Sequence, residues 1–212
     1  MSARDVVLGR LRSALGPAPA VPEVPRGYRQ RGDLETSAVV SLFLARVDDY
    51  RARVHRCRPD EVAEVVARAL GTGPGGEQPQ RVVVPADLDD AWLAGLPGDA
   101  EVIRDTEALS AADLDRFDAV VTAAAVGIAE TGTVVLDGGP DQGRRAITLV
   151  PDHHVCVVRA DQVVQTVPEA LARLVPTRPL TLISGPSATS DIELERVEGV
   201  HGPRTLDVVL VT

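Results

Sequence analysis

The apolar residues of this chain follow two spacings, one typical of helices and one typical of buried strands. Between Val6 and Leu15 they recur at three- and four-residue intervals after a capping pair of Ser2 and Asp5, which predicts a helix ending at Gly16. The same spacing predicts further helices over residues 34–45, 59–70, 88–96, 110–117 and 167–174.

Short runs rich in valine separate these helices and predict strands that are buried on both faces. The expected strands are residues 53–56, 81–85, 101–104, 118–122, 133–136, 146–150, 154–159, 180–184 and 204–211. Because most strands alternate with helices, we predict an α/β fold with a mainly parallel sheet flanked by helices. No helix separates the strands between residues 133 and 159, so we expect these to pair antiparallel or to form a β-rich lobe on that sheet.

The first 29 residues form a separate part of the predicted chain. Residues 17–29 contain four prolines, which favours an extended linker over a helix. We therefore divide the chain into an N-terminal helix with a proline-rich linker, residues 1–29, and an α/β domain, residues 30–212. The first helix is then a detached arm that either packs back on the domain or meets a partner.

Composition and charge narrow the class of function. The formal net charge is −9 and aromatic residues make up only 2% of the 212 residues. Nucleic acid is excluded as a partner because the chain offers no basic stripe for phosphates, and the basic residues between Arg46 and Arg58 indicate a solvated helix-to-strand segment. The N-terminus lacks the apolar region of a signal peptide, and no apolar run is long enough for a membrane span, so we expect a cytoplasmic protein.

The two cysteines, Cys57 and Cys156, do not form a metal-binding pattern. No C-x-x-C spacing is present, so the chain cannot build a four-thiolate iron–sulfur or zinc site of its own. Disulfides are rare in the cytoplasm, and we expect two reduced thiols. We therefore expect no cofactor in this chain.

Three segments of the second half of the chain carry the candidate chemistry. They are residues 127–133, residues 151–154, and residues 184–193 with their continuation at 199–203. Glycine, serine and threonine dominate them, and each lies beside an apolar run. Loops of this kind at strand ends suit a small polar or anionic ligand.

Each segment supplies candidate site residues. The candidate catalytic residues are Glu130, His201 and Asp191, and the candidate ligand-binding residues are Gly127, Thr131, Gly132, Thr133, His154, Ser184, Gly185, Ser187, Glu193 and Gly202. Glu130 is a possible base, nucleophile or hydrogen-bond acceptor, and the alternative is a tight turn in which it caps backbone donors. His201 either faces a ligand and titrates near neutral pH or bonds the backbone of its loop.

Two pairs of neighbouring residues bear on the same site. His153 and His154 should point to opposite faces of a strand, so we do not expect them to bind one metal together. Arg144 and Arg145 would have to hold an anion because no lysine is near these loops. They form either a hairpin tip that leans over the site or a solvated surface pair.

Taken together, the three segments resemble the LUD domain of lactate utilization protein C over roughly residues 30–212. The resemblance implies a fold like that of the sugar-phosphate isomerase and CoA-transferase superfamily, some members of which use a loop glutamate as nucleophile. It also implies a role beside iron–sulfur partner proteins, which would hold the clusters, in oxidising L-lactate to pyruvate. Two other readings stay open: a free-standing enzyme on phosphorylated or CoA-linked metabolites, and a pure protein-interaction module.

Overall fold

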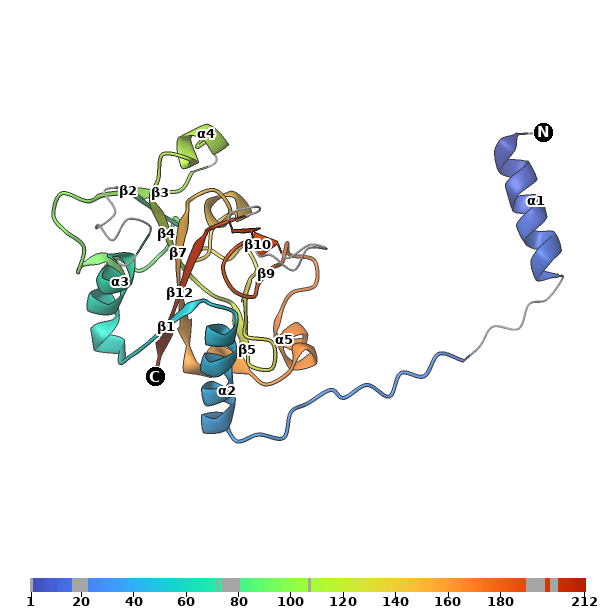
Figure 1. Ribbon diagram of the computed structural model, residues 1–212, viewed down its shortest axis with the longest axis horizontal. Coiled ribbons are helices and arrows are strands. Elements are labelled where there is room, and N and C mark those ends of the chain that lie inside the picture. The colour runs from blue at the N-terminus through green and yellow to red at the C-terminus, as the bar shows by residue number, and fades with distance from the viewer. Residues whose placement is uncertain are drawn as a thin grey trace.

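A six-stranded parallel sheet forms the centre of the α/β domain. The structure is a computed structural model, and it describes residues 2–16, 23–71, 73, 81–106, 108–189, 197–198 and 202–212 (Figure 1). The strand order is β1-β12-β7-β4-β2-β3, and every neighbouring pair is parallel. The strands are β1 (Arg53–Cys57), β2 (Arg81–Val84), β3 (Glu101–Arg104), β4 (Ala119–Ala123), β7 (His153–Arg159) and β12 (Thr205–Val211). The predicted mainly parallel α/β fold is confirmed.

Helices cover both faces of this sheet, which is why its central strands are apolar on both sides. On one face α2 (Thr36–Asp49) packs Phe43 into a cluster with Val208 of β12. On the other face α3 (Val62–Leu70) packs Val66 into a cluster with Val209. The remaining helices are α1 (Ala3–Leu15), α4 (Ala111–Leu114) and α5 (Val167–Arg173), with 3₁₀ helices at Pro59–Glu61, Asp90–Leu93, Arg145–Thr148 and Ala160–Gln162.

A second, smaller sheet packs beside the first and corresponds to the predicted β-rich lobe. Its order is β8-β5-β6-β9, with β6 antiparallel to both neighbours and β8 parallel to β5. The strands are β5 (Val126–Ile128), β6 (Thr133–Leu136), β8 (Val163–Val164) and β9 (Thr181–Ile183). Two further strands of two residues each, β10 (Ala188–Thr189) and β11 (Val197–Glu198), come after β9 and pair antiparallel.

Three expected elements differ from the structure. The helix expected over residues 88–96 is only a 3₁₀ helix, because Gly95 and Pro97 oppose its extension. The strand expected over residues 146–150 is wrong: this segment is a 3₁₀ helix in which the Thr148 hydroxyl donates to the carbonyl of Arg145 at 3.0 Å. Strand β7 lies in the main parallel sheet between β4 and β12. The expected antiparallel pairing with β6 is therefore wrong.

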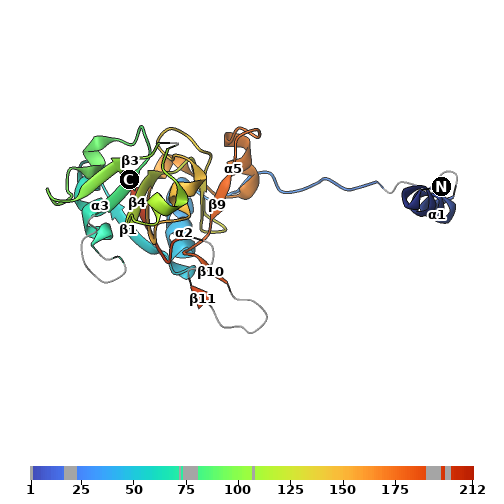
Figure 2. The same cartoon turned by 90° about the horizontal axis from the view of Figure 1, so that it is seen from above.

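Helix α1 begins with the predicted capping box of Ser2 and Asp5, and none of its residues is buried. Figures 1 and 2 show it apart from both sheets, at the end of an extended segment. Residues 17–22 of the predicted linker lie outside the described residues. Every helix in the described part of the chain is too short or too polar to cross a membrane.

A buried carboxylate joins three strands at the amino-terminal end of the sheet. Asp207 of β12 is fully buried and accepts hydrogen bonds from Arg53 at 2.7 Å, from His55 at 2.6 Å and from His153 at 2.7 Å. Burial alone raises the pKa of Asp207, but the bonds to His153 and His55 outweigh burial and the pKa lies below its usual value. The expectation of a solvated basic segment is therefore wrong at Arg53 and His55, which pair with this carboxylate.

We expect Asp207→Asn to lower the free energy of unfolding by about 3 kcal/mol, because it leaves Arg53 and two histidines without their shared carboxylate. Asp152→Asn is the matched control, since Asp152 pairs with Arg204 while both side chains are 42–53% exposed. The control should lose less than about 1 kcal/mol. Urea unfolding of both variants measures the difference, and equal losses would contradict a special role for Asp207.

Candidate functional site

Segments 151–154 and 184–187, together with residues 202–203, meet at one pocket between the two sheets. The cavity measures about 220 Å³. It is lined by Arg145, Thr148, Leu149, His154, Thr181, Leu182, Ile183, Ser184, Gly185, Pro186, Ser187, Gly202, Pro203 and Leu206. We call it the serine-loop pocket, after the loop of residues 184–187 that follows β9. Its lining combines hydroxyl groups, one guanidinium and one imidazole, which suits a small polar ligand.

Local backbone contacts hold the loop in place. Gly185 has a φ of +83°, and a Cβ there would lie 2.4 Å from the carbonyl oxygen of Tyr50, so only glycine fits. The Ser187 N–H donates to the carbonyl of Pro203 at 2.8 Å. This bond joins the loop to the segment that leads into β12, and the pocket is therefore built by the two ends of residues 184–205.

His154 borders the pocket from the face of β7 opposite to His153, as predicted. Its Nε2 lies 2.8 Å from the Thr122 hydroxyl, and its Nδ1 is buried without a hydrogen-bond partner among the described residues. Burial, and secondarily the nearby His153, lowers the pKa of His154 to about 3. The ring is thus neutral at physiological pH.

The hydrogen bonds around Thr122 indicate the tautomer of His154. The Thr122 hydroxyl also donates to Cys156 Sγ at 3.8 Å. The Cys156 thiol in turn donates to the carbonyl of Ala123 at 3.8 Å. Because the single hydrogen of the Thr122 hydroxyl is directed at Cys156, His154 Nε2 must carry the hydrogen in its contact with Thr122. This arrangement leaves the lone pair of His154 Nδ1 as an unused acceptor.

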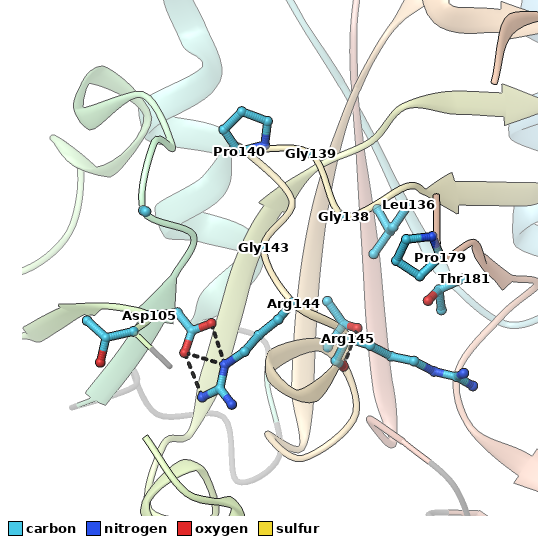
Figure 3. Close-up of a pocket in the computed structure, with 13 residues that line it drawn as sticks. Asp105, Leu136, Gly138, Gly139, Pro140, Gly143, Arg144, Arg145, Pro179 and Thr181 are labelled. Carbon is cyan, nitrogen blue, oxygen red and sulfur yellow. Dashed lines mark hydrogen bonds and ion pairs between the residues drawn. The ribbon is translucent and has the colours of Figure 1, made fainter. Parts of the chain in front are cut away.

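Arg145 differs from its neighbour Arg144. Arg144 makes bidentate bonds of 2.8–3.0 Å to Asp105, which is nearly buried, and donates to the Leu109 carbonyl at 2.6 Å. The Arg145 guanidinium has no ion pair within the described part of the chain. Figure 3 shows its side chain extending away from the Arg144–Asp105 pair. The two arginines thus form neither a hairpin tip nor a solvated pair, and only Arg145 has a cation available to a ligand.

A groove continues from the serine-loop pocket across Arg145, Thr148 and Thr181, which line both cavities. It measures about 400 Å³ and also borders Ala86, Asp105, Thr106, Leu136, Gly138, Gly139, Pro140, Gly143, Arg144 and Pro179 (Figure 3). The two cavities are therefore neighbours, and Arg145, Thr148 and Thr181 stand between them.

The segment of residues 127–133 reaches this site only through hydroxyl contacts. Thr131 Oγ1 lies 2.7 Å from Thr133 Oγ1, which lies 2.7 Å from the Ser184 hydroxyl. Gly127 lies in β5, where a Cβ would come within 3.2 Å of the Phe43 ring, and Gly132 turns with a φ of +56° against the backbone of Arg46. Both glycines therefore serve close packing between elements.

Glu130 lies outside the described pockets. Its carboxylate pairs with Arg29 and accepts from Gln165 Nε2 at 3.2 Å. The buried Gln165 side chain also accepts from the N–H of Leu34 at 2.9 Å. These contacts hold residues 29–34 against the second sheet, so the surroundings of Glu130 are those of a link between segments.

Of the remaining candidate residues, some line the serine-loop pocket and the others lie outside the described part of the chain. His154, Ser184, Gly185, Ser187 and Gly202 all line the serine-loop pocket. Asp191, Glu193 and His201 lie outside the described residues. No three histidine, cysteine, aspartate or glutamate side chains among the described residues are placed to hold a metal ion. Cys57 and Cys156 are both free thiols.

Residues 40–211 match the family model of the LUD domain. The chain belongs to the LUD domain family. The resemblance that the three segments carry is thereby confirmed, and it extends over nearly the whole α/β domain.

Relatives of this LUD domain chain support the same assignment. It is 47% identical over 195 residues to lactate utilization protein C of Deinococcus radiodurans, an alignment that covers 90% of this chain and 87% of the relative. It is 38% identical over 94 residues to lactate utilization protein C of Geobacillus kaustophilus, covering 40% of this chain and 38% of that one. A 1.70 Å crystal structure of a DUF162 family protein from Deinococcus radiodurans matches with a TM-score of 0.69 and 42% identity, covering 85% of this chain and 100% of that chain.

We expect stability to fall with acid in a way that depends on His154. Its pKa is lower in the folded state than the usual 6.5, so the unfolded state binds a proton first as the pH falls. The contribution is fully present above about pH 6.5 and is lost progressively toward about pH 3. The stability lost between pH 7 and pH 5 through this one group is about 2 kcal/mol. Urea unfolding at both pH values should show that His154→Gln loses less stability than the original chain, and identical losses would contradict the buried neutral ring.

We expect Glu130→Gln to loosen residues 29–34 because it removes the charge that pairs with Arg29. Amide hydrogen exchange in that segment should become faster, with a small change in global stability, as is usual for an exposed ion pair. Glu35→Gln serves as control, since no ion pair involves Glu35 in the described residues. Unchanged exchange in the Glu130 variant, together with impaired ligand binding, would instead favour a role for Glu130 at a site.

Proposed function

We propose that this LUD domain chain is a subunit or accessory protein of a lactate utilization system and that it binds a small carboxylate in the serine-loop pocket. The names of its relatives in two genera support the first part. The observation that carries the second part is Arg145, a cation without an ion pair among the described residues, at the mouth of a pocket of hydroxyl groups.

The chemistry of the pocket fits a 2-hydroxycarboxylate. A guanidinium presents parallel N–H donors that match the two oxygens of a carboxylate. The hydroxyls of Ser184 and Ser187 supply further neutral donors and acceptors. His154 borders the pocket as a neutral ring and adds no charge, and the serine hydroxyls can bond a ligand hydroxyl. L-lactate combines both features.

Iron–sulfur partner proteins complete the proposed system. This chain offers two separated cysteines, one of them buried on each face of the main sheet, so oxidation of lactate would take place on partners that hold the clusters. Helix α1, with exposed Val7, Leu11 and Leu15, supplies an apolar surface for such contacts. The chain itself would contribute ligand binding and assembly.

We expect Arg145→Gln to weaken binding of L-lactate about 10- to 100-fold, since a charge-assisted bond is lost without a change in fold. Arg68→Gln is the control, because Arg68 lies on α3 across the main sheet and pairs with exposed Glu64 at 3.5 Å. Isothermal titration with L-lactate and with pyruvate measures both variants.

The same two variants test the role in the cell. In a strain whose own copy of this protein is deleted, Arg68→Gln should restore growth on L-lactate as sole carbon source and Arg145→Gln should not. Growth of the deletion strain itself on L-lactate at the normal rate would overturn the role in lactate utilization. Equal affinities of the two variants would overturn the assignment of the pocket.

A further inference from the structure

The groove beside the serine-loop pocket is larger than the pocket itself. Its volume of about 400 Å³ adds to the 220 Å³ of the pocket, and the two share Arg145 and two threonines. Cavities of several hundred Å³ are the size that organic ligands much larger than a three-carbon acid occupy. A ligand held by its carboxylate at Arg145 therefore has room to extend in one direction, along this groove.

The charged side chains at one end of the groove are already paired. The Arg144 guanidinium is engaged by Asp105 and by the Leu109 carbonyl, so neither group is a strong partner for a charged ligand. Beyond Arg145, the walls consist largely of carbon, and Ala86, Leu136, Pro140 and Pro179 are among the lining residues. In Figure 3 Pro140 belongs to the loop of Gly138, Gly139 and Gly143, and Pro179 lies beside Leu136 and Thr181.

The glycine segment of residues 138–143 resembles a phosphate-binding loop in composition, but three of its N–H groups donate to acceptors of the same loop. The Asp137 N–H donates to the Gln142 side chain at 2.6 Å and the Gly139 N–H to the Asp137 side chain at 3.1 Å. The N–H groups of Gln142 and Gly143 both donate to the Gly139 carbonyl, at 3.0 and 2.9 Å. With these three donors occupied, fewer N–H groups of the segment are left for a phosphate, which favours an uncharged ligand group here.

We infer that the groove binds the apolar tail of a carboxylic acid whose head group occupies the serine-loop pocket, so that 2-hydroxy acids with longer side chains bind more tightly than L-lactate. This inference rests on the proposed function. It adds a ligand class, the 2-hydroxy acids with apolar side chains of several carbons, and a second subsite that selects for them.

Isothermal titration with a chain-length series of L-2-hydroxy acids tests it. The series is L-lactate, 2-hydroxybutanoate, 2-hydroxyhexanoate and 2-hydroxyoctanoate. Each methylene that enters an apolar groove should tighten binding by about threefold to fourfold. Ala86→Trp, which places an indole in the groove from an exposed position, should flatten this dependence on chain length. Ala172→Trp, an exposed position on α5 outside the groove, should keep it.

The outcomes separate the inference from the function on which it rests. Absence of binding by every acid overturns both. Binding of L-lactate with a flat series overturns the groove as a tail site and leaves the proposed function standing. A chain-length gain that persists in Ala86→Trp places the tail elsewhere and also overturns the inference. Tighter binding of 3-phosphoglycerate than of 2-hydroxyhexanoate would assign the groove to phosphorylated ligands instead.

Discussion

The pairing of β12 with β1 on one side and β7 on the other is the constraint on which the domain depends. This last strand lies inside the sheet, and it carries the fully buried Asp207 that joins all three strands through polar bonds. The residues leading into β12 also supply the wall of the serine-loop pocket, through the bond between Ser187 and Pro203. The same strand therefore joins β1 to the rest of the sheet and contributes to the shape of the pocket.

The two histidines of β7 show how one strand serves both purposes. Successive side chains point to opposite faces, so His153 meets Asp207 under α3 while His154 meets Thr122 beside the pocket. One imidazole is bonded to a buried carboxylate, and the other is kept neutral by burial. A shift of register by one residue would exchange these surroundings, so the alternation fixes the pairing of β7 as firmly as its valines do.

Much of the fold followed from the sequence because burial on both faces demands continuous apolar runs. The strands at residues 81–84 and 119–123 and the helix after Pro59 are examples. Strand β5 was not predicted, since a three-residue strand centred on Gly127 has the composition of a loop. The order of the strands could not be predicted either, because it is decided by contacts such as that of Arg53 with Asp207, 154 residues apart.

The site was predictable only in part, and for a similar reason. Small polar residues after β9 marked the serine loop, and its position beside His154 agrees with the idea of a shared pocket. Nothing in the sequence distinguishes Arg145 from Arg144, because the difference lies in Asp105, which follows β3 and reaches only Arg144. Likewise, the lone aspartate in the apolar run of β12 was a signal for a buried ionic cluster, but its partners lie on other strands.

The position of β12 between β1 and β7 has a consequence for how the chain folds. Closing the sheet requires contacts between segments far apart in sequence, and such topologies fold slowly because the entropy of loop closure is lost before the contacts form. Until β12 inserts, the edges of β1 and β7 that it joins are unpaired, and that of β7 carries Val155, Val157 and Val158. Exposed edges of this kind recruit other chains, so partly folded molecules of this protein are expected to be prone to aggregation, and expression at lower temperature and concentration should favour the native sheet.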